Sequence, residues 1–431
     1  MMRRHLSALA LLACTAAPAA AQDLAIRGAT ILTATRGTIT NGTIVVRNGK
    51  ITAVGTDVQI PAGMKVIDGA GKFVTPGLID AHSHMAMEGG VNEGTDVVTP
   101  EVVVQIRQDD PALFRALAGG VTVANVLHGS ANAIGGQAAV IKLRWGRPAD
   151  ELYVEGAPRI VKFALGENPK RSRSAGEDDE ERRFPATRMG VEQTYRWWFT
   201  AAQKYRDEWR AYEAKRDRNA VPPRRDLRME ALVDILEGRL LVHAHSYRAD
   251  EILMLIRVAE DFGFKIHTFQ HVLEGYKVAD EIARHGAMAS TFAESWAYKV
   301  EAFDAIPHNM AIMTQRGVRV SVNSDSPERV RRLYQEAPIG MKYGGMTEEQ
   351  ALAMITINPA YQLGLQERIG SIEVGKDGDL AIFSAHPFEP EAHVEMTVID
   401  GRVYFDRSQV PTLERAAPPA AKVTASTEGG R

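Results

Sequence analysis

The sequence predicts an α/β fold: a (β/α)8 TIM barrel joined to a small β-sandwich domain that is built from both ends of the chain. Strand-like apolar runs alternate with helical stretches over about 290 residues in the middle of the chain, as a parallel barrel requires. Short runs of β-forming residues, broken by Gly and Asn, occur before residue 73 and return after residue 369. Histidines and one aspartate stand at the ends of several predicted barrel strands, where barrel enzymes carry their catalytic groups.

These patterns set the expected domain organisation. The boundaries are a signal peptide at 1–21, the β-sandwich at 22–75 plus 366–410, the barrel at 76–365 and a disordered tail at 411–431. A helical insert at about 170–230 interrupts the barrel rhythm, with a charge run from Glu177 to Arg183 followed by many aromatic residues. We interpret it as a solvated loop and a helical hairpin over the barrel mouth. The aromatic residues are most simply core contacts of the insert, with a substrate lid as the alternative.

The first residues are typical of a secretory signal. Arg3 and Arg4 precede a short apolar core, and Ala19–Ala21 form a small-residue cleavage site. The apolar core is too short to span a bilayer, so we expect no transmembrane segment and a periplasmic or secreted protein. The run ending at Cys14 loosely resembles a lipoprotein cleavage box, which makes lipid anchoring the less favoured alternative.

The composition points to a small-molecule substrate. The 431 residues are 45% hydrophobic and 24% charged, with a formal net charge of -3. This is ordinary globular composition, without the basic stripe that nucleic-acid binding needs. We therefore expect no nucleic-acid partner.

The most informative stretch runs from Pro76 to His84. It reads as a strand end that presents His82 and His84 in alternation, and side chains at i and i+2 point to the same face of a strand. Both imidazoles can therefore reach one metal ion. Asp80 lies on the same face, one step earlier.

More residues of this kind follow at later strand ends. The pairs His243/His245 and His267/His271 each end a predicted strand, and Asp325 ends another. One histidine of each pair, the first two histidines and the aspartate would converge at the C-terminal face of the barrel. Nitrogen and oxygen ligands suit zinc, and manganese, iron or cobalt less specifically. The other member of each pair, and His285, are more simply structural or supporting residues.

This pattern resembles the amidohydrolase superfamily, most closely the branch of imidazolonepropionase-like enzymes and metallo-dipeptidases that act on Xaa-Pro or Xaa-Arg substrates. The resemblance covers nearly the whole mature chain. It is carried by the segments Val74–His84, Thr356–Ala360 and Gly370–Leu380. It implies the fold inferred above and a metal site whose ligands match His82, His84, His245, His271 and Asp325.

Binuclear members of the superfamily also use a carboxylated lysine that bridges two metal ions. Lys162 is the best match, because a buried lysine near two cations would be driven to lose its charge. Glu167 is a rival bridge, and a mononuclear site without a bridge is the third alternative. The resemblance thus implies one or two divalent metal ions, most simply zinc.

The expected mechanism is attack of metal-activated hydroxide on an amide carbonyl, with Asp325 as general base and then general acid. His128 follows the second strand and could help to stabilise the oxyanion, or could be a loop histidine. The resemblance suggests that Tyr247 holds a substrate carboxylate, with Arg248 beside it. Gly135–Gln137 could approach the substrate with backbone, or form a plain turn.

The expected function is hydrolysis of an amide bond, most simply in a dipeptide or an N-acyl amino acid. A cyclic-amide hydrolase of the imidazolonepropionase type or a deaminase is the alternative within the superfamily. A non-catalytic binding protein on the same scaffold is the alternative of another class. Relatives are often oligomeric, so a homo-oligomer is left open.

Overall fold

The structure is a computed structural model that describes residues 23–87, 96–171, 184–215 and 219–410. The expected signal peptide, Cys14, the charge run at 177–183 and the tail at 411–431 lie outside the described residues. Among the helices within the described ranges, none combines the length and the apolar character needed to cross a membrane.

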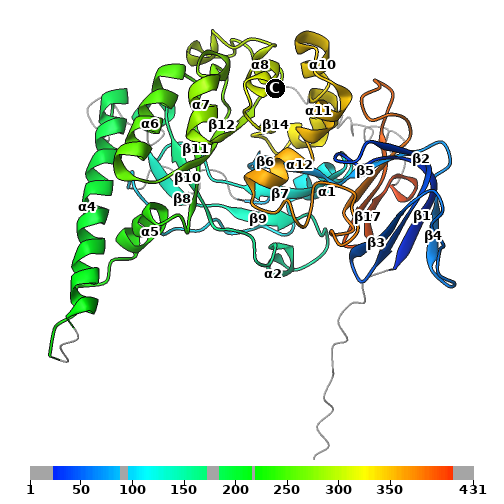
Figure 1. Ribbon diagram of the computed structural model, residues 1–431, viewed down its shortest axis with the longest axis horizontal. Coiled ribbons are helices and arrows are strands. Elements are labelled where there is room, and N and C mark those ends of the chain that lie inside the picture. Colours follow the sequence, from blue (N-terminus) through cyan, green and yellow to red (C-terminus); the bar gives the residue numbers. More distant parts are fainter. Residues whose placement is uncertain (1–22, 88–95, 172–183, 216–218, 411–431) are drawn as a thin grey trace, which may run out of the picture.

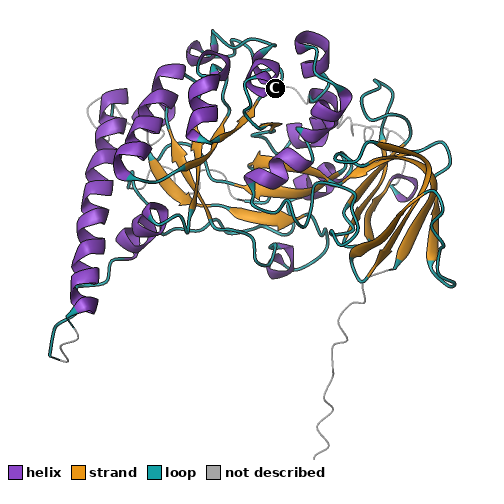
Figure 2. Ribbon diagram, in the orientation of Figure 1, coloured by secondary structure: helices purple, strands orange, loops and turns teal. Residues whose placement is uncertain are grey.

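A sheet at one end of the molecule contains strands from both ends of the chain (Figures 1 and 2). It has eight strands in the order β17-β16-β15-β5-β1-β2-β3, with β4 paired to β1. Their bounds are β1 Leu24–Leu32, β2 Thr38–Arg47, β3 Lys50–Gly55, β4 Lys65–Asp68, β5 Phe73–Pro76, β15 Leu380–Phe383, β16 Val394–Ile399 and β17 Arg402–Asp406. The antiparallel pairing of β5 with β15 joins the two chain ends. A sandwich of two separate sheets stays a prediction.

The remaining strands form a TIM-barrel-like α/β arrangement. Their bounds are β6 Leu78–Ser83, β7 Val121–Val126, β8 Ile134–Gln137, β9 Ala139–Lys142, β10 Ile160–Ala164, β11 Leu241–His245, β12 Ile266–Gln270, β13 Met288–Thr291 and β14 Val320–Val322. They fall into a six-stranded sheet, β14-β13-β12-β11-β10-β8, and a three-stranded sheet, β6-β7-β9. Of the strands that position the candidate ligands, β6, β10 and β14 are buried along their whole length, and β11 and β12 each have one half-buried residue, as expected for strands covered on both faces.

Two departures from a regular barrel explain why the hydrogen-bonded strands form two sheets. First, β8 and β9 are separated by a single residue, Ala138, and run antiparallel to β10 and β7 respectively. Second, in the described chain no strand pairing joins β6 to β14. The backbone of Met354 and Ile355 fills this seam instead, since Ile79 N donates to Ile355 O and Val322 N donates to Met354 O.

Helices cover the outside of the barrel strands (Figure 2). Their bounds are α1 Pro111–Leu117, α2 Ala149–Leu152, α3 Glu167–Arg171, α4 Arg188–Ala214, α5 Leu227–Leu236, α6 Ala249–Phe262, α7 Ala279–His285, α8 Asn309–Gln315, α9 Leu333–Glu336, α10 Ile339–Gly344, α11 Glu348–Ala353 and α12 Ile357–Gln362. Helix α6 is typical: it buries Ile252, Leu255 and Ala259 on one face and ends at Gly263, whose φ of 78° is the left-handed conformation that closes many helices.

The expected hairpin over the barrel mouth is wrong in position. Helix α4 packs along the outer side of the barrel, against α5 and α6 (Figure 1). The reason is a buried stripe at i and i+4: inside the main core, Tyr195 stacks on Phe163 of β10, and the tilted ring of Phe199 lies beside the same phenylalanine. The outward-facing Trp197 is 66% exposed. The aromatic residues therefore divide between core contacts and the surface.

Candidate metal centre

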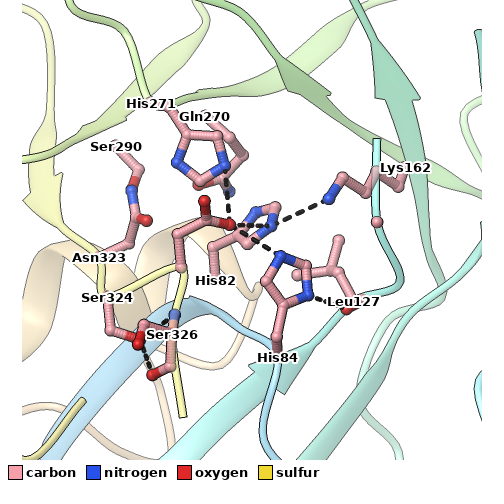
Figure 3. A network of polar contacts seen from close by, with 12 residues as sticks. His82, His84, Leu127, Lys162, Gln270, His271, Ser290, Asn323, Ser324 and Ser326 are labelled. Atoms are coloured by element: carbon pink, nitrogen blue, oxygen red, sulfur yellow. Dashed lines mark hydrogen bonds and ion pairs between the residues drawn. The ribbon is translucent and has the colours of Figure 1, made fainter. Parts of the chain in front are cut away.

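Three imidazoles converge on one carboxylate at the end of the barrel strands (Figure 3). The Nε2 atoms of His84, His82 and His271 lie 2.8, 3.3 and 3.3 Å from Oδ1 of Asp325. His82 comes from β6 and His84 follows it directly, while His271 follows β12 and Asp325 follows β14. Suitable ligand atoms of His82, His271 and Asp325 lie within 4.8 Å of one another, close enough to hold one metal ion.

The backbone is strained at two of these residues. His271 and Asp325 have φ values of 60° and 48°, in the left-handed region that residues with a Cβ seldom adopt. Such strain persists only where the surroundings enforce it, and it gathers at functional sites. Here it turns both side chains toward the cluster.

Lys162 of β10 reaches the same cluster. Its Nζ lies 3.1 Å from His82 Nε2 and donates a hydrogen bond to the carbonyl oxygen of His128 at 2.6 Å. Its side chain is buried. The position agrees with the expectation for a bridging group, and its carboxylation stays a prediction.

His245 of β11 stands beside His271, with ring centroids 5.0 Å apart. Both residues are buried, and within the described chain neither ring nitrogen of His245 has a hydrogen-bond partner. A buried polar atom without a partner costs free energy, so such an atom calls for a ligand. A divalent cation would satisfy these nitrogens, and the donor set of imidazoles and a carboxylate fits one.

Burial sets the protonation of the cluster. It lowers the pKa of His82 and His245 well below the usual value, with Lys162 and neighbouring imidazoles adding to the effect. It also lowers the pKa of His271 to about 3. Burial alone would raise the pKa of Asp325, but His271 and His84 outweigh it and hold that pKa well below its usual range. Neutral imidazoles and an ionised carboxylate are the forms that bind metal.

Asp80 lies behind the cluster rather than in it. Its carboxylate accepts hydrogen bonds from Ser324 N at 3.1 Å, from Ser324 Oγ and from His82 N at 3.3 Å. Burial raises its pKa to about 6 in spite of the hydrogen bonds from Ser324.

The three expected substrate-binding residues differ in position. His128 is buried, and its ring nitrogens face the carbonyl oxygens of Gly129 and Gly136 at 2.7 and 3.2 Å. Tyr247 is buried with its ring edge-on to His245, 4.7 Å between centroids. Arg248 instead forms an ion pair with Asp250 at the start of α6, with 42% of its side chain exposed. Only Tyr247 thus has its ring against a candidate ligand, and the substrate-binding role of all three stays a prediction.

Gly135, the first of the two glycines before Gln137, has a packing role. A Cβ on Gly135 would lie 2.3 Å from Cε1 of His128, so the backbone of β8 can pass the His128 ring only as glycine.

The three histidines expected to be structural or supporting, His243, His267 and His285, have structural partners. His243 contacts Gln362 O at 3.0 Å and Gln270 Nε2 at 2.9 Å, and its ring stacks on that of His267. His285 accepts from Ile266 N at 3.1 Å. Glu167, the rival bridge, begins α3, and its carboxylate lies 3.7 Å from Lys299 Nζ.

Sequence reasoning missed the residues that follow β13. Phe292 stacks on His271 at 4.7 Å, Tyr298 shares a 2.8 Å hydrogen bond with the Tyr247 hydroxyl, and Lys299 Nζ lies 4.2 Å over the Tyr247 ring. No histidine lies near the end of this strand, although a carboxylate, Glu294, follows it by three residues, as Asp325 follows β14. The position of this segment at the C-terminal end of a barrel strand was the available signal.

Comparisons with known proteins agree with this geometry. The sequence model of the amidohydrolase family matches residues 73–404. The crystal structure of an amidohydrolase from Thermotoga maritima MSB8 superposes with a TM-score of 0.81 at 35% identity, covering 89% of this chain and 100% of the other. Imidazolonepropionase from Geobacillus sp. (strain WCH70) is 24% identical over 85% of this chain and 90% of its own length.

Two further relatives add context. An amidohydrolase of Hapsidospora irregularis is 29% identical over 85% of this chain, but this chain spans only 40% of that protein. A prolidase crystallised with N-methylphosphonate-L-proline shares the fold, with a TM-score of 0.55 and 17% identity over 89% of this chain.

The barrel-like fold and the histidine–aspartate cluster at its strand ends define the class, a metal-dependent hydrolase that acts on carbon–nitrogen bonds. The chain belongs to the amidohydrolase family.

Proposed function

We propose that this protein is a periplasmic or secreted enzyme that hydrolyses the amide bond of a dipeptide or an N-acyl amino acid. The observation that carries the hydrolytic part is the convergence of His82, His84 and His271 on Asp325. The location rests on residues 1–21, which lie outside the described chain. We propose zinc as the metal, with His245 and a carboxylated Lys162 completing the ligands of two ions.

When bound, a divalent ion polarises a carbonyl and lowers the pKa of water to near 7. The chain's own groups then move the protons. All three imidazole contacts of Asp325 involve Oδ1, so we assign proton transfer to Oδ2. Oδ2 accepts the proton of the attacking water and delivers it to the departing amine, as general base and then general acid.

The choice of substrate is supported by the groups beside His245. The Tyr247 hydroxyl and the Lys299 ammonium are a hydrogen-bond donor and a cation, the groups that a substrate carboxylate needs. Lys299 is also 3.1 Å from Glu301, so a substrate carboxylate would have to share it. Tyr247 stays uncharged, because burial and then the neighbouring Tyr298 raise its pKa.

Hydrolysis of a cyclic amide is the second candidate. It is favoured by relatives named imidazolonepropionase that match 80–88% of the chain at 23–26% identity. A deaminase is a further alternative. A binding protein without activity is disfavoured, because the chain has a histidine or an aspartate at each position where the resemblance implies a metal ligand: His82, His84, His245, His271 and Asp325.

A substrate panel tests the proposal. Metal-loaded protein is assayed against dipeptides, N-acyl amino acids, imidazolone-type cyclic amides and aminopurines, with Asp325→Asn as the inactive control. We expect release of amino acids from the first two classes by the wild type alone. Turnover confined to a cyclic amide or an aminopurine would transfer the function to the second candidate or to a deaminase. No turnover of any compound by metal-loaded protein would refute catalysis of these reactions.

A further inference from the structure

The metal ligands come from two sides of the seam in the barrel. His82 and His84 belong to β6 and its end, in the three-stranded sheet, while Asp325 follows β14, at the edge of the six-stranded sheet. Within the described chain no strand pairing joins these two strands. Strand pairing therefore does not fix the distance between Asp325 and the two histidines, although metal binding depends on that distance.

The side chain of Asp80 forms hydrogen bonds across this seam. Asp80 lies in β6, two residues before His82, and is fully buried. Its carboxylate accepts two hydrogen bonds from Ser324, one from the backbone N at 3.1 Å and one from the hydroxyl. A backbone hydrogen bond also crosses the seam, because Asp325 N donates to His82 O at 3.0 Å.

The Ser324 hydroxyl also shapes the turn that holds Asp325. Besides donating to Asp80, it accepts a hydrogen bond from Ser326 N at 3.2 Å (Figure 3). The residue between the two serines, Asp325, has the left-handed φ of 48° described above. Without outside support, a turn with such a residue would relax toward a more common conformation.

We propose that Asp80 is a positioning residue, which, through Ser324, holds Asp325 in its left-handed conformation at the distance from His82 and His84 that metal binding requires. Asp80 is not itself a ligand in this proposal, because its oxygens are taken up by Ser324 and His82 N. Hydrogen bonds that orient ligands are commonly worth 10- to 100-fold in metal affinity or activity, so we expect an effect of about that size.

The test uses the full chain, four single variants, and the double variant that combines Asp80→Asn with Ser324→Ala. Asp80→Asn keeps the shape but removes one acceptor, and Ser324→Ala removes the hydroxyl. Ser324→Thr keeps the hydroxyl and should restore function. The matched control is Thr397→Val, which removes an equally buried hydroxyl that donates to Leu117 O at 2.6 Å, at the junction with the small sheet.

Three quantities are measured: zinc affinity by chelator competition, kcat and KM on the best substrate, and hydrogen exchange of the Asp325 amide in metal-free protein. For Asp80→Asn and Ser324→Ala we expect zinc affinity about 10- to 100-fold weaker, a lower kcat with little change in KM, and faster exchange of the Asp325 amide. The double variant should be no worse than the worse single variant, since both break one link. Ser324→Thr and Thr397→Val should keep wild-type affinity.

The proposal would be overturned if Ser324→Ala bound zinc as the wild type does, if the two substitutions added independently, or if Thr397→Val lost as much affinity. If Asp80→Asn does not fold, the comparison of Ser324→Ala with Ser324→Thr tests the proposal by itself. Affinity and exchange need no substrate, so they test this link even if the proposed amide hydrolysis fails.

Discussion

At the scale of single residues, the centre combines groups that burial keeps in their metal-binding forms. His245 offers two buried nitrogens without partners among the described residues, and Asp325 is held ionised by its neighbours. The unpaired nitrogens of His245 cost free energy in the metal-free protein, because buried polar atoms without partners are destabilising. A bound divalent cation would satisfy them.

The bridge at Lys162 gives a prediction about metal content. We expect Lys162→Ala to bind one zinc ion where the wild type binds two, because the variant lacks the anionic oxygens that a carboxylated lysine would supply. Elemental analysis of purified protein checks the ratio, and Lys170→Ala, which changes a lysine of α3, is the control. An unchanged ratio in Lys162→Ala would show that Lys162 does not bridge.

A second residue-scale prediction concerns Glu336. Burial raises the pKa of its carboxyl from 4.5 to about 7, with Arg329 acting against the shift and Glu294 and Asp80 adding to it. A raised pKa means that the stability contribution of this carboxyl is complete below pH 4.5 and is lost as pH rises through about 7.

The difference in the free energy of unfolding between Glu336→Gln and the wild type should therefore change with pH. It should shift in favour of the variant by about 3 kcal/mol as the pH rises from 4 to 8. Urea denaturation of both proteins across this range measures the difference. A difference that does not change with pH would contradict the shift.

The sequence revealed the candidate site unevenly. His82, His84 and Asp325 were predicted to meet, and they do, because alternation along a strand and the common face of barrel strand ends are simple geometric rules. Lys299 and Ser324 could not be found this way. Their importance depends on which loop touches which, and that is set by packing between distant segments.

At the scale of elements, Lys142 of β9 joins the barrel to the small sheet. Its buried Nζ lies 2.8 Å from Asp377 Oδ2 and 2.9 Å from Asp379 Oδ2, and it also contacts Asp400 in the turn between β16 and β17. Burial alone would lower the pKa of Lys142, but the three carboxylates overcome this and raise it. Because the ammonium lies among the three carboxylates, we interpret the cluster as a structural anchor.

Breaking this anchor should be costly. Lys142→Met leaves three carboxylates facing one another, so we expect a loss of about 3–5 kcal/mol in the free energy of unfolding, measured by urea denaturation. Lys204→Met is the matched control, because the Lys204 side chain is 80% exposed and its ion pair with Glu208 is long, at 3.9 Å. It should cost less than about 1 kcal/mol. Equal losses in the two variants would contradict a special role for Lys142.

Helix α4 shows where element prediction failed. Its sequence was correctly interpreted as helical, but the position over the mouth was wrong. The aromatic stripe of Tyr195 and Phe199 has the same spacing whether it covers a barrel flank or a substrate. Only the residue against which the stripe packs, Phe163 of β10, distinguishes the barrel flank from a substrate lid. A single sequence does not show which distant residues pack together.

At the scale of the whole molecule, the alternation of strands and helices was enough to predict a barrel-like fold, and the β-rich ends were enough to predict a shared small domain. The antiparallel β8–β9 crossing and the seam between β6 and β14 were not predictable. Strand direction and closure depend on long-range pairing, which leaves little trace in local residue patterns. The seam matters for function, because no strand pairing joins the ligands on its two sides, and they are linked by the hydrogen bonds of Asp80 with Ser324 and of Asp325 N with His82 O.

The metal content of the folded protein tests the central claim most directly. Elemental analysis of purified protein should give at least one tightly held divalent ion per chain, and His271→Ala combined with Asp325→Asn should abolish it while the circular dichroism spectrum stays that of a folded protein. Less than one equivalent in well-folded wild-type protein, or full metal content in the double variant, would contradict the assignment of this cluster as the metal centre of a hydrolase.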